Sequence, residues 1–145
     1  MSRLTTLLCI AFLTALLAAC AQAAASTSGA IGDCESHRAE VAKRWGPVQS
    51  VSGAFAVSAL DVVRWQETRD AAQGIRPVSP LRRLNIPDAA PLLVCFYDGD
   101  FDHFPGRGTR PPFDRISVII EATGRYTLDT AGPRRYFKVE RPGQR

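Results

Sequence analysis

Apolar and polar positions in the second half of the chain follow the spacing of β-strands. Residues 92–97 form a continuous apolar run of strand length, and residues 115–122 place isoleucine or valine at every second position. Turns that contain glycine then introduce two shorter segments, residues 125–129 and 135–140. The pattern therefore predicts four strands in an antiparallel sheet.

A short helical pattern lies in the first half of the chain. Residues 33–47 place three apolar side chains near one face at helical spacing, although an arginine falls among them. Asp33 is the expected N-cap, and Gly46 with the following proline would end the helix. Because its apolar face is narrow, this helix needs support from the rest of the fold.

A second helix is predicted by stronger signals over residues 57–74. Ser58 and Asp61 have the spacing of a capping box, and Gly74 is a natural residue to follow the last helical turn. Trp65 lies on the same side of this helix as the other apolar residues. We therefore expect Trp65 to anchor the core rather than to contact a ligand.

The order of these elements indicates one α+β domain that spans residues 33–145. Four prolines between residues 75 and 91 exclude long regular structure there, although Ser79 and Pro80 favour a single helical turn. The expected architecture is two N-terminal helices packed on one face of a four-stranded antiparallel sheet.

The first residues have the pattern of a secretory signal peptide. A short positively charged stretch precedes an uncharged apolar run over residues 4–17. A transmembrane helix needs about 20 predominantly apolar residues, and here the apolar character decays after Leu17. Residues 20–32 are mostly small and uncharged, which predicts a flexible tether between the signal peptide and the domain.

Two cleavage sites compete at the end of this signal. Residues 17–20, Leu-Ala-Ala-Cys, resemble the lipobox of bacterial lipoproteins. The resemblance implies that residues 1–19 are removed, that Cys20 carries a lipid and that the protein is anchored to the cell membrane or the outer membrane. The alternative is ordinary cleavage after Ala23, which would release a secreted or periplasmic protein.

Both alternatives leave the same two cysteines in the mature chain. Lipidation uses Cys20, ordinary cleavage removes it, and Cys9 lies within the signal peptide. Because an oxidising compartment favours pairing of the remaining thiols, we predict a disulfide between Cys34 and Cys95. The alternative is a pair of buried free thiols.

A cluster of acidic side chains follows the first predicted strand. Asp98, Asp100, Asp102 and His103 lie within six residues, and alternating carboxylates can coordinate Ca²⁺. An EF-hand needs glycine at the sixth position of its loop, where His103 stands, and glutamate at the twelfth, where Thr109 stands. We therefore expect no metal site and interpret the cluster as a polar strand end.

The loop over residues 99–113 is long for a connection in a compact domain, and such loops often bind partners. Its phenylalanines and arginines would form a recognition surface if they were exposed. If the phenylalanines were buried, they would form a small core beneath the loop. The residues concerned are Phe101, Phe104, Arg107, Arg110 and Phe113.

Composition argues against several classes of function. The net charge of +4 is too small to indicate nucleic-acid binding, and motifs of serine hydrolases, zinc proteases and phosphate-binding loops are absent from the sequence. We therefore predict a non-enzymatic binding module of the bacterial cell envelope, without a cofactor. Its partners would be the membrane, through the lipid, and an envelope protein or polymer, through the 99–113 loop. The alternative is a soluble secreted enzyme or Ca²⁺-binding domain that uses the acidic cluster.

Overall fold

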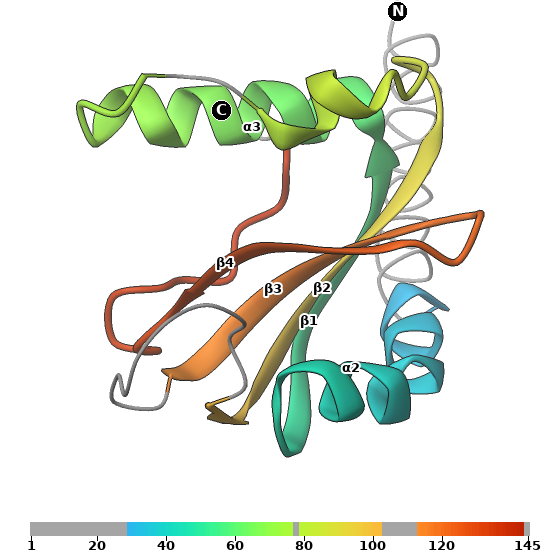
Figure 1. Ribbon diagram of the computed structural model, residues 1–145, viewed down its shortest axis with the longest axis vertical. Helices are drawn as coiled ribbons and strands as arrows, with labels where there is room; N and C mark the ends of the chain where they lie inside the picture. The colour runs from blue at the N-terminus through green and yellow to red at the C-terminus, as the bar shows by residue number, and fades with distance from the viewer. Residues whose placement is uncertain (1–28, 77–78, 103–112, 144–145) are drawn as a thin grey trace, which may run out of the picture.

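A four-stranded antiparallel sheet forms the centre of the molecule (Figure 1). The structure is a computed structural model that describes residues 29–76, 79–102 and 113–143. Neighbours along the chain are neighbours in the sheet, so that the strand order is β1-β2-β3-β4. The strands are β1 (Val48–Ser58), β2 (Pro91–Phe101), β3 (Phe113–Glu121) and β4 (Tyr126–Gly132).

Helices cover both faces of this sheet. Helical residues 29–36 and α2 (Arg38–Trp45) lie on one face, and α3 (Ala59–Ala72) lies on the other. A short 3-10 helix, η1 (Pro80–Leu84), packs beside α3. Successive side chains of a strand point to opposite faces, so alternate residues of β2 enter two separate cores.

The α2-face core contains the predicted disulfide between Cys34 and Cys95, whose Cα atoms are 5.8 Å apart. The Tyr97 hydroxyl donates a hydrogen bond of 2.8 Å to the carbonyl oxygen of Cys34, which joins the same helix and strand a second time. Val41 and Trp45 of α2 are buried in this core. Each such side chain contributes roughly 1.5–3 kcal/mol by leaving water.

The α3-face core is centred on Phe96 of β2. Trp65, Phe55 and Phe137 all pack against the Phe96 ring, with ring centroids 6.3, 6.0 and 5.6 Å away. Phe137 belongs to residues 133–143, which we call the C-terminal segment. This segment leaves β4 and crosses the α3 face of the sheet (Figure 1).

The α+β class, the four-stranded antiparallel sheet and several element ends are confirmed. The Ser58 hydroxyl accepts a hydrogen bond from the Asp61 backbone N–H at 3.2 Å, so Ser58 caps α3 as predicted. Gly74 follows α3 with a positive φ of 69°, and Gly46 ends α2 with a φ of 121°. Ser79 caps η1.

Three details differ from expectation. The helices lie on both faces of the sheet instead of one. β1 was not predicted, because its alternation is blurred by serine, glycine and alanine in a half-exposed strand at the edge of the sheet. Residues 135–140 are not a strand, because the C-terminal segment packs across the sheet instead of pairing with its edge.

The first helix also begins earlier than predicted. Residues 29–36 are helical, so the predicted tether over residues 20–32 includes helical residues at its end. Ala30 is buried in the α2-face core, and Asp33 lies inside the helix instead of at its N-cap. A turn at His37 separates this helix from α2. None of the helices within the described residues is long and apolar enough to cross a membrane.

Candidate ligand-binding cleft

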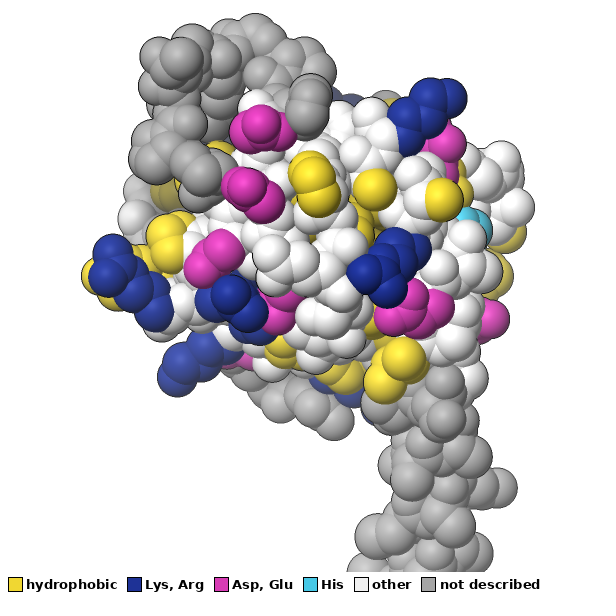
Figure 2. Space-filling view, turned by 90° about the horizontal axis from the view of Figure 1, so that it is seen from below, with side chains coloured by type: hydrophobic (Ala, Val, Ile, Leu, Met, Phe, Trp, Pro, Cys, Tyr) yellow, Lys and Arg dark blue, Asp and Glu magenta, His cyan; other side chains and the backbone are white. Residues whose placement is uncertain are grey.

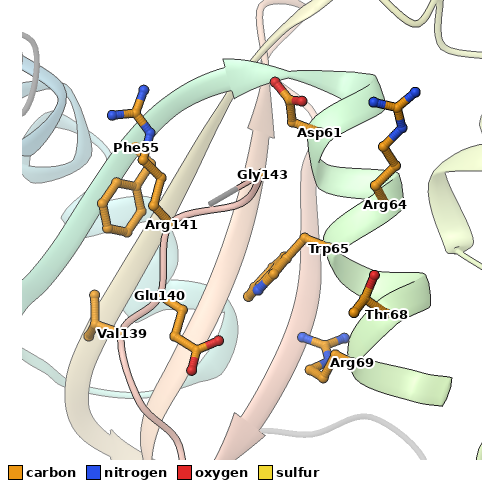
Figure 3. Close-up of a pocket in the computed structure, with 10 residues that line it drawn as sticks. All are labelled: Phe55, Asp61, Arg64, Trp65, Thr68, Arg69, Val139, Glu140, Arg141 and Gly143. Atoms are coloured by element: carbon orange, nitrogen blue, oxygen red, sulfur yellow. The ribbon is translucent and has the colours of Figure 1, made fainter. Parts of the chain in front are cut away.

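A cavity of about 490 Å³ opens between α3 and the C-terminal segment (Figure 3). Its volume lies in the range of small-molecule sites in proteins, roughly 300–1,000 Å³. A second hollow of about 320 Å³ continues along α3 and shares Trp65, Arg69 and Glu140 with the first. We call the larger cavity the cleft. It is lined by Phe55, Asp61, Arg64, Trp65, Thr68, Arg69, Val139, Glu140, Arg141 and Gly143.

The apolar wall of the cleft is an extension of the α3-face core. The Trp65 side chain projects from α3 toward the C-terminal segment, while Phe55 and Val139 lie across from it (Figure 3). Trp65 is only 8% exposed, which confirms it as a core residue. Because it also lines the cleft, a core side chain forms part of the candidate binding surface.

The Arg69 guanidinium is held in place by a buried carboxylate behind the cleft. Arg69 lies over the Trp65 ring, 4.9 Å from its centroid, and donates hydrogen bonds of 2.8 and 3.2 Å to Asp129. Gln66, at 2.6 Å, and Ser117, at 2.8 Å, also donate to Asp129. Burial alone would raise the pKa of Asp129, but the hydrogen bond and the charge of Arg69 outweigh it and lower that pKa.

A second ion pair fixes the C-terminal segment to the sheet. Arg115 of β3 binds Asp98 of β2 through two hydrogen bonds of 2.7 and 3.0 Å, and donates another of 2.8 Å to the Phe137 carbonyl oxygen. Burial opposes ionisation of Asp98, but the Arg115 guanidinium holds its pKa below the ordinary value. The segment that forms one side of the cleft is therefore attached to the sheet by both polar and aromatic contacts.

Two arginines of the cleft have no such partner. Arg64 projects from α3 and Arg141 from the C-terminal segment, on opposite sides of the cavity (Figure 3). Both are exposed, and within residues 29–76, 79–102 and 113–143 neither forms an ion pair or a hydrogen bond through its side chain. In contrast, Asp61 accepts a hydrogen bond of 2.8 Å from the Ser58 hydroxyl, and Glu140 also has a partner. Among the described residues, the charged side chains of the cleft that lack a partner are therefore Arg64 and Arg141.

The surface seen from below the view of Figure 1 shows no comparable binding surface among the described residues (Figure 2). Figure 2 shows hydrophobic side chains on this face that are scattered among Lys, Arg, Asp and Glu. Single exposed apolar residues are normal on soluble proteins and do not indicate a binding surface.

The acidic cluster predicted from the sequence does not come together as a metal site in the part of the chain that the structure describes. Asp98 is buried and bound to Arg115, whereas Asp100 and Asp102 are exposed. Among the described residues, no group of three or more His, Cys, Asp and Glu side chains could hold a metal ion. His103 lies outside those residues.

The predicted binding loop is described only at its two ends. Phe101 is fully buried in the α2-face core, and Phe113 is partly buried against the same core. Both phenylalanines therefore take the packed arrangement of the two that the sequence allowed. Phe104, Arg107 and Arg110 lie outside the described residues, as does Cys20.

The cleft itself was not predicted from the sequence. One local signal for it existed, because Arg69 falls on the same side of its helix as Val62 and Trp65. An arginine on an apolar helix face needs a buried acceptor, which the structure identifies as Asp129. No comparable signal marks Arg64 and Arg141, which line one cavity only because the C-terminal segment passes beside α3.

Comparisons of the chain with protein-family models, curated proteins and solved structures found no match.

Proposed function

We propose that this protein is a non-enzymatic binding domain of the bacterial cell envelope and that it holds a small ligand in the cleft between α3 and the C-terminal segment. The observation that carries the proposal is an open cavity of about 490 Å³ whose apolar wall is packed against the core and whose unpaired charged side chains, among the described residues, are two arginines. Sites of this kind combine mostly apolar walls with a few polar groups that orient the ligand.

The buried carboxylates favour binding over catalysis. A general acid or base works best when its pKa lies near the operating pH. Although burial opposes the shift, the pKa values of Asp98 and Asp129 are lowered, away from neutral pH, because each carboxylate is bound by an arginine. Such groups hold neighbouring elements in place and are poor proton donors at neutral pH.

The disulfide is compatible with a location outside the cytoplasm, because oxidising compartments preserve such bonds. Within that setting, Cys20 is the proposed lipid-anchor residue. Intact-mass analysis of protein made in a bacterium that processes lipoproteins tests this, and we expect the mass of a lipidated chain that begins at Cys20. A mass that matches an unmodified chain beginning at Ala24 would contradict lipidation and leave the cleft unaffected.

The 99–113 loop stays a prediction as a second contact surface for an envelope protein or polymer. The cleft is the stronger candidate, because Phe101 and Phe113 pack into the core instead of facing outward. An enzyme or Ca²⁺ site built on Asp98 is less favoured, since Arg115 already occupies both of its carboxylate oxygens.

Fluorescence of Trp65 provides a direct test of the cleft. The chain has two tryptophans, and Trp45→Phe leaves Trp65 as the single emitter. We expect at least one member of a set of anionic, neutral and cationic small molecules to shift the Trp65 emission and to raise the melting temperature. If no member of any charge class does either, the proposed function is wrong.

A pair of variants on α3 locates the binding. Thr68 lines the cleft, whereas Ala71 is exposed on the same helix and does not line it. Thr68→Phe should weaken ligand binding by filling the cavity, and Ala71→Phe should leave it unchanged. Equal affinities in the two variants would place the ligand elsewhere.

A further inference from the structure

We infer that the cleft selects a ligand with one carboxylate attached to a hydrophobic group. The inference rests on the proposed function, since it assigns a ligand class to the same cavity. It combines three features of the cleft: two uncommitted arginines, an apolar wall beside them, and two acidic side chains that limit how much negative charge a ligand can carry.

The two arginines supply the site for the carboxylate. Arg64 belongs to α3 and Arg141 to the C-terminal segment, and because their side chains lie on opposite sides of the cavity, each offers a separate guanidinium to a carboxylate bound there (Figure 3). Guanidinium groups donate paired hydrogen bonds that match the geometry of a carboxylate. Arg69 is unsuited to this role, because Asp129 and the Trp65 ring already hold it.

The apolar wall requires a hydrophobic group on the ligand. Trp65, Phe55 and Val139 line the cavity, and the first two are fixed by edge-on packing against Phe96. A ligand placed against these side chains removes apolar surface from water without reordering them, which lowers the entropic cost of binding. A bare anion such as acetate would leave this wall uncovered and should bind far more weakly.

The acidic side chains argue for a single negative charge. Asp61 and Glu140 line the same cavity as Arg64 and Arg141. Two arginines beside two carboxylates leave little excess positive charge, so a ligand with several negative charges would meet repulsion. A monocarboxylate satisfies the arginines without that cost.

A matched series of probes tests the inference. The compounds 4-phenylbutyrate, 4-phenylbutan-1-ol and 4-phenylbutylamine share one hydrophobic group and differ in charge, and acetate carries the carboxylate alone. Calorimetry on the oxidised mature protein should show 4-phenylbutyrate binding about tenfold more tightly than the alcohol, as a charge-assisted hydrogen bond predicts. The amine should bind least tightly of the three, and acetate should show no measurable binding.

Variants then separate charge recognition from general effects. Arg64→Gln and Arg141→Gln should each weaken 4-phenylbutyrate by about tenfold and leave the alcohol unchanged. Arg83→Gln removes the same charge from an exposed position of η1 and should change neither affinity. Near-ultraviolet circular dichroism confirms that each variant keeps its fold.

The outcomes distinguish the two proposals. Equal affinities for the acid, the alcohol and the amine would overturn the selection of carboxylates while supporting a binding cleft. An equal loss in Arg83→Gln would overturn it too, because the effect would then come from net charge. If only molecules outside this series bind the cleft, the ligand class is wrong and the binding function stands.

Discussion

The two faces of the sheet are filled in different ways. The α2-face core is built from apolar side chains around the Cys34–Cys95 disulfide. The α3-face core is apolar around Phe96 but also holds two carboxylates, Asp98 and Asp129, each bound to an arginine. One face is thus joined by a covalent bond and the other by buried polar contacts.

This difference suggests that the disulfide mainly stabilises the fold, whereas the buried ion pairs mainly fix the positions of the elements around the cleft. Apolar burial is insensitive to orientation, whereas a buried carboxylate with several donors fixes where each donor must lie. Asp129 binds side chains from α3 and β3, and Arg115 binds the C-terminal segment. The polar face is also the face that carries the cleft. We therefore attribute the shape of the cleft to the two ion pairs and the position of the first helix to the disulfide.

The largest expected effect comes from removing the disulfide. In the chain-entropy description, a bond that closes a sequence separation of 61 residues contributes about 4 kcal/mol to the free energy of unfolding. Cys34→Ser with Cys95→Ser should lose about that amount in urea denaturation. Hydrogen exchange should become faster in residues 29–45 and stay slow in α3. An unchanged free energy of unfolding would show that the bond has no structural role.

A somewhat smaller loss is expected from the polar face. Asp129→Asn removes the nearer counter-charge of the partly buried Arg69 and leaves it Asp70 at 3.7 Å, and breaking such a pair costs about 3 kcal/mol. Glu67→Gln is the control, because it removes the carboxylate of the more exposed pair with Arg82 and should cost less than about 1 kcal/mol. If the two variants lose equal stability, Asp129 does not organise this face.

Acid should weaken the polar face selectively. Asp98 and Asp129 have lower pKa values in the folded protein than in the unfolded chain, so the folded state binds fewer protons. Their contribution is therefore complete above the ordinary carboxylate pKa, about 4, and is lost as the pH falls below it. Between pH 5 and pH 3 the wild type should lose more stability than Asp129→Asn does. Asp88→Asn, which changes an exposed carboxylate, should follow the wild type.

The smallest effect is expected at the N-caps of the helices on the two faces, α2 and α3. Ser58 caps α3 through its hydroxyl, whereas His37 at the start of α2 makes no such hydrogen bond. Ser58→Ala should cost about 1 kcal/mol in urea denaturation. The same change on Ser50, an exposed residue of β1, is the control and should stay within about 0.5 kcal/mol of wild type.

Local signals predicted those parts of the molecule that depend on neighbours in the sequence. The cap at Ser58 and the end of α3 at Gly74 need only a few adjacent residues to be recognised. The disulfide was predictable because, with the predicted signal peptide set aside, only Cys34 and Cys95 remain to pair. β1 was not predictable, since its small and polar side chains become strand-like only when β2 lies beside them.

The cleft depended on contacts that no local pattern contains. Phe55 and Trp65 come from the consecutive elements β1 and α3, whereas Arg141 comes from an irregular segment much later in the chain. Their meeting follows from the path of the C-terminal segment, which was predicted as a strand. Because the C-terminal segment was predicted to pair with the sheet edge, the cavity that it forms with α3 could not be predicted either.

Gly53 of β1 restricts which side chain can stand at position 139 of the C-terminal segment. A β-carbon at this residue would overlap the Val139 side chain, because the C-terminal segment lies directly on β1 there. A lineage that acquires alanine at position 53 would have to shorten the side chain at position 139 or shift the segment. An exchange on β1, at a residue that does not line the cleft, would therefore change the shape of the cleft.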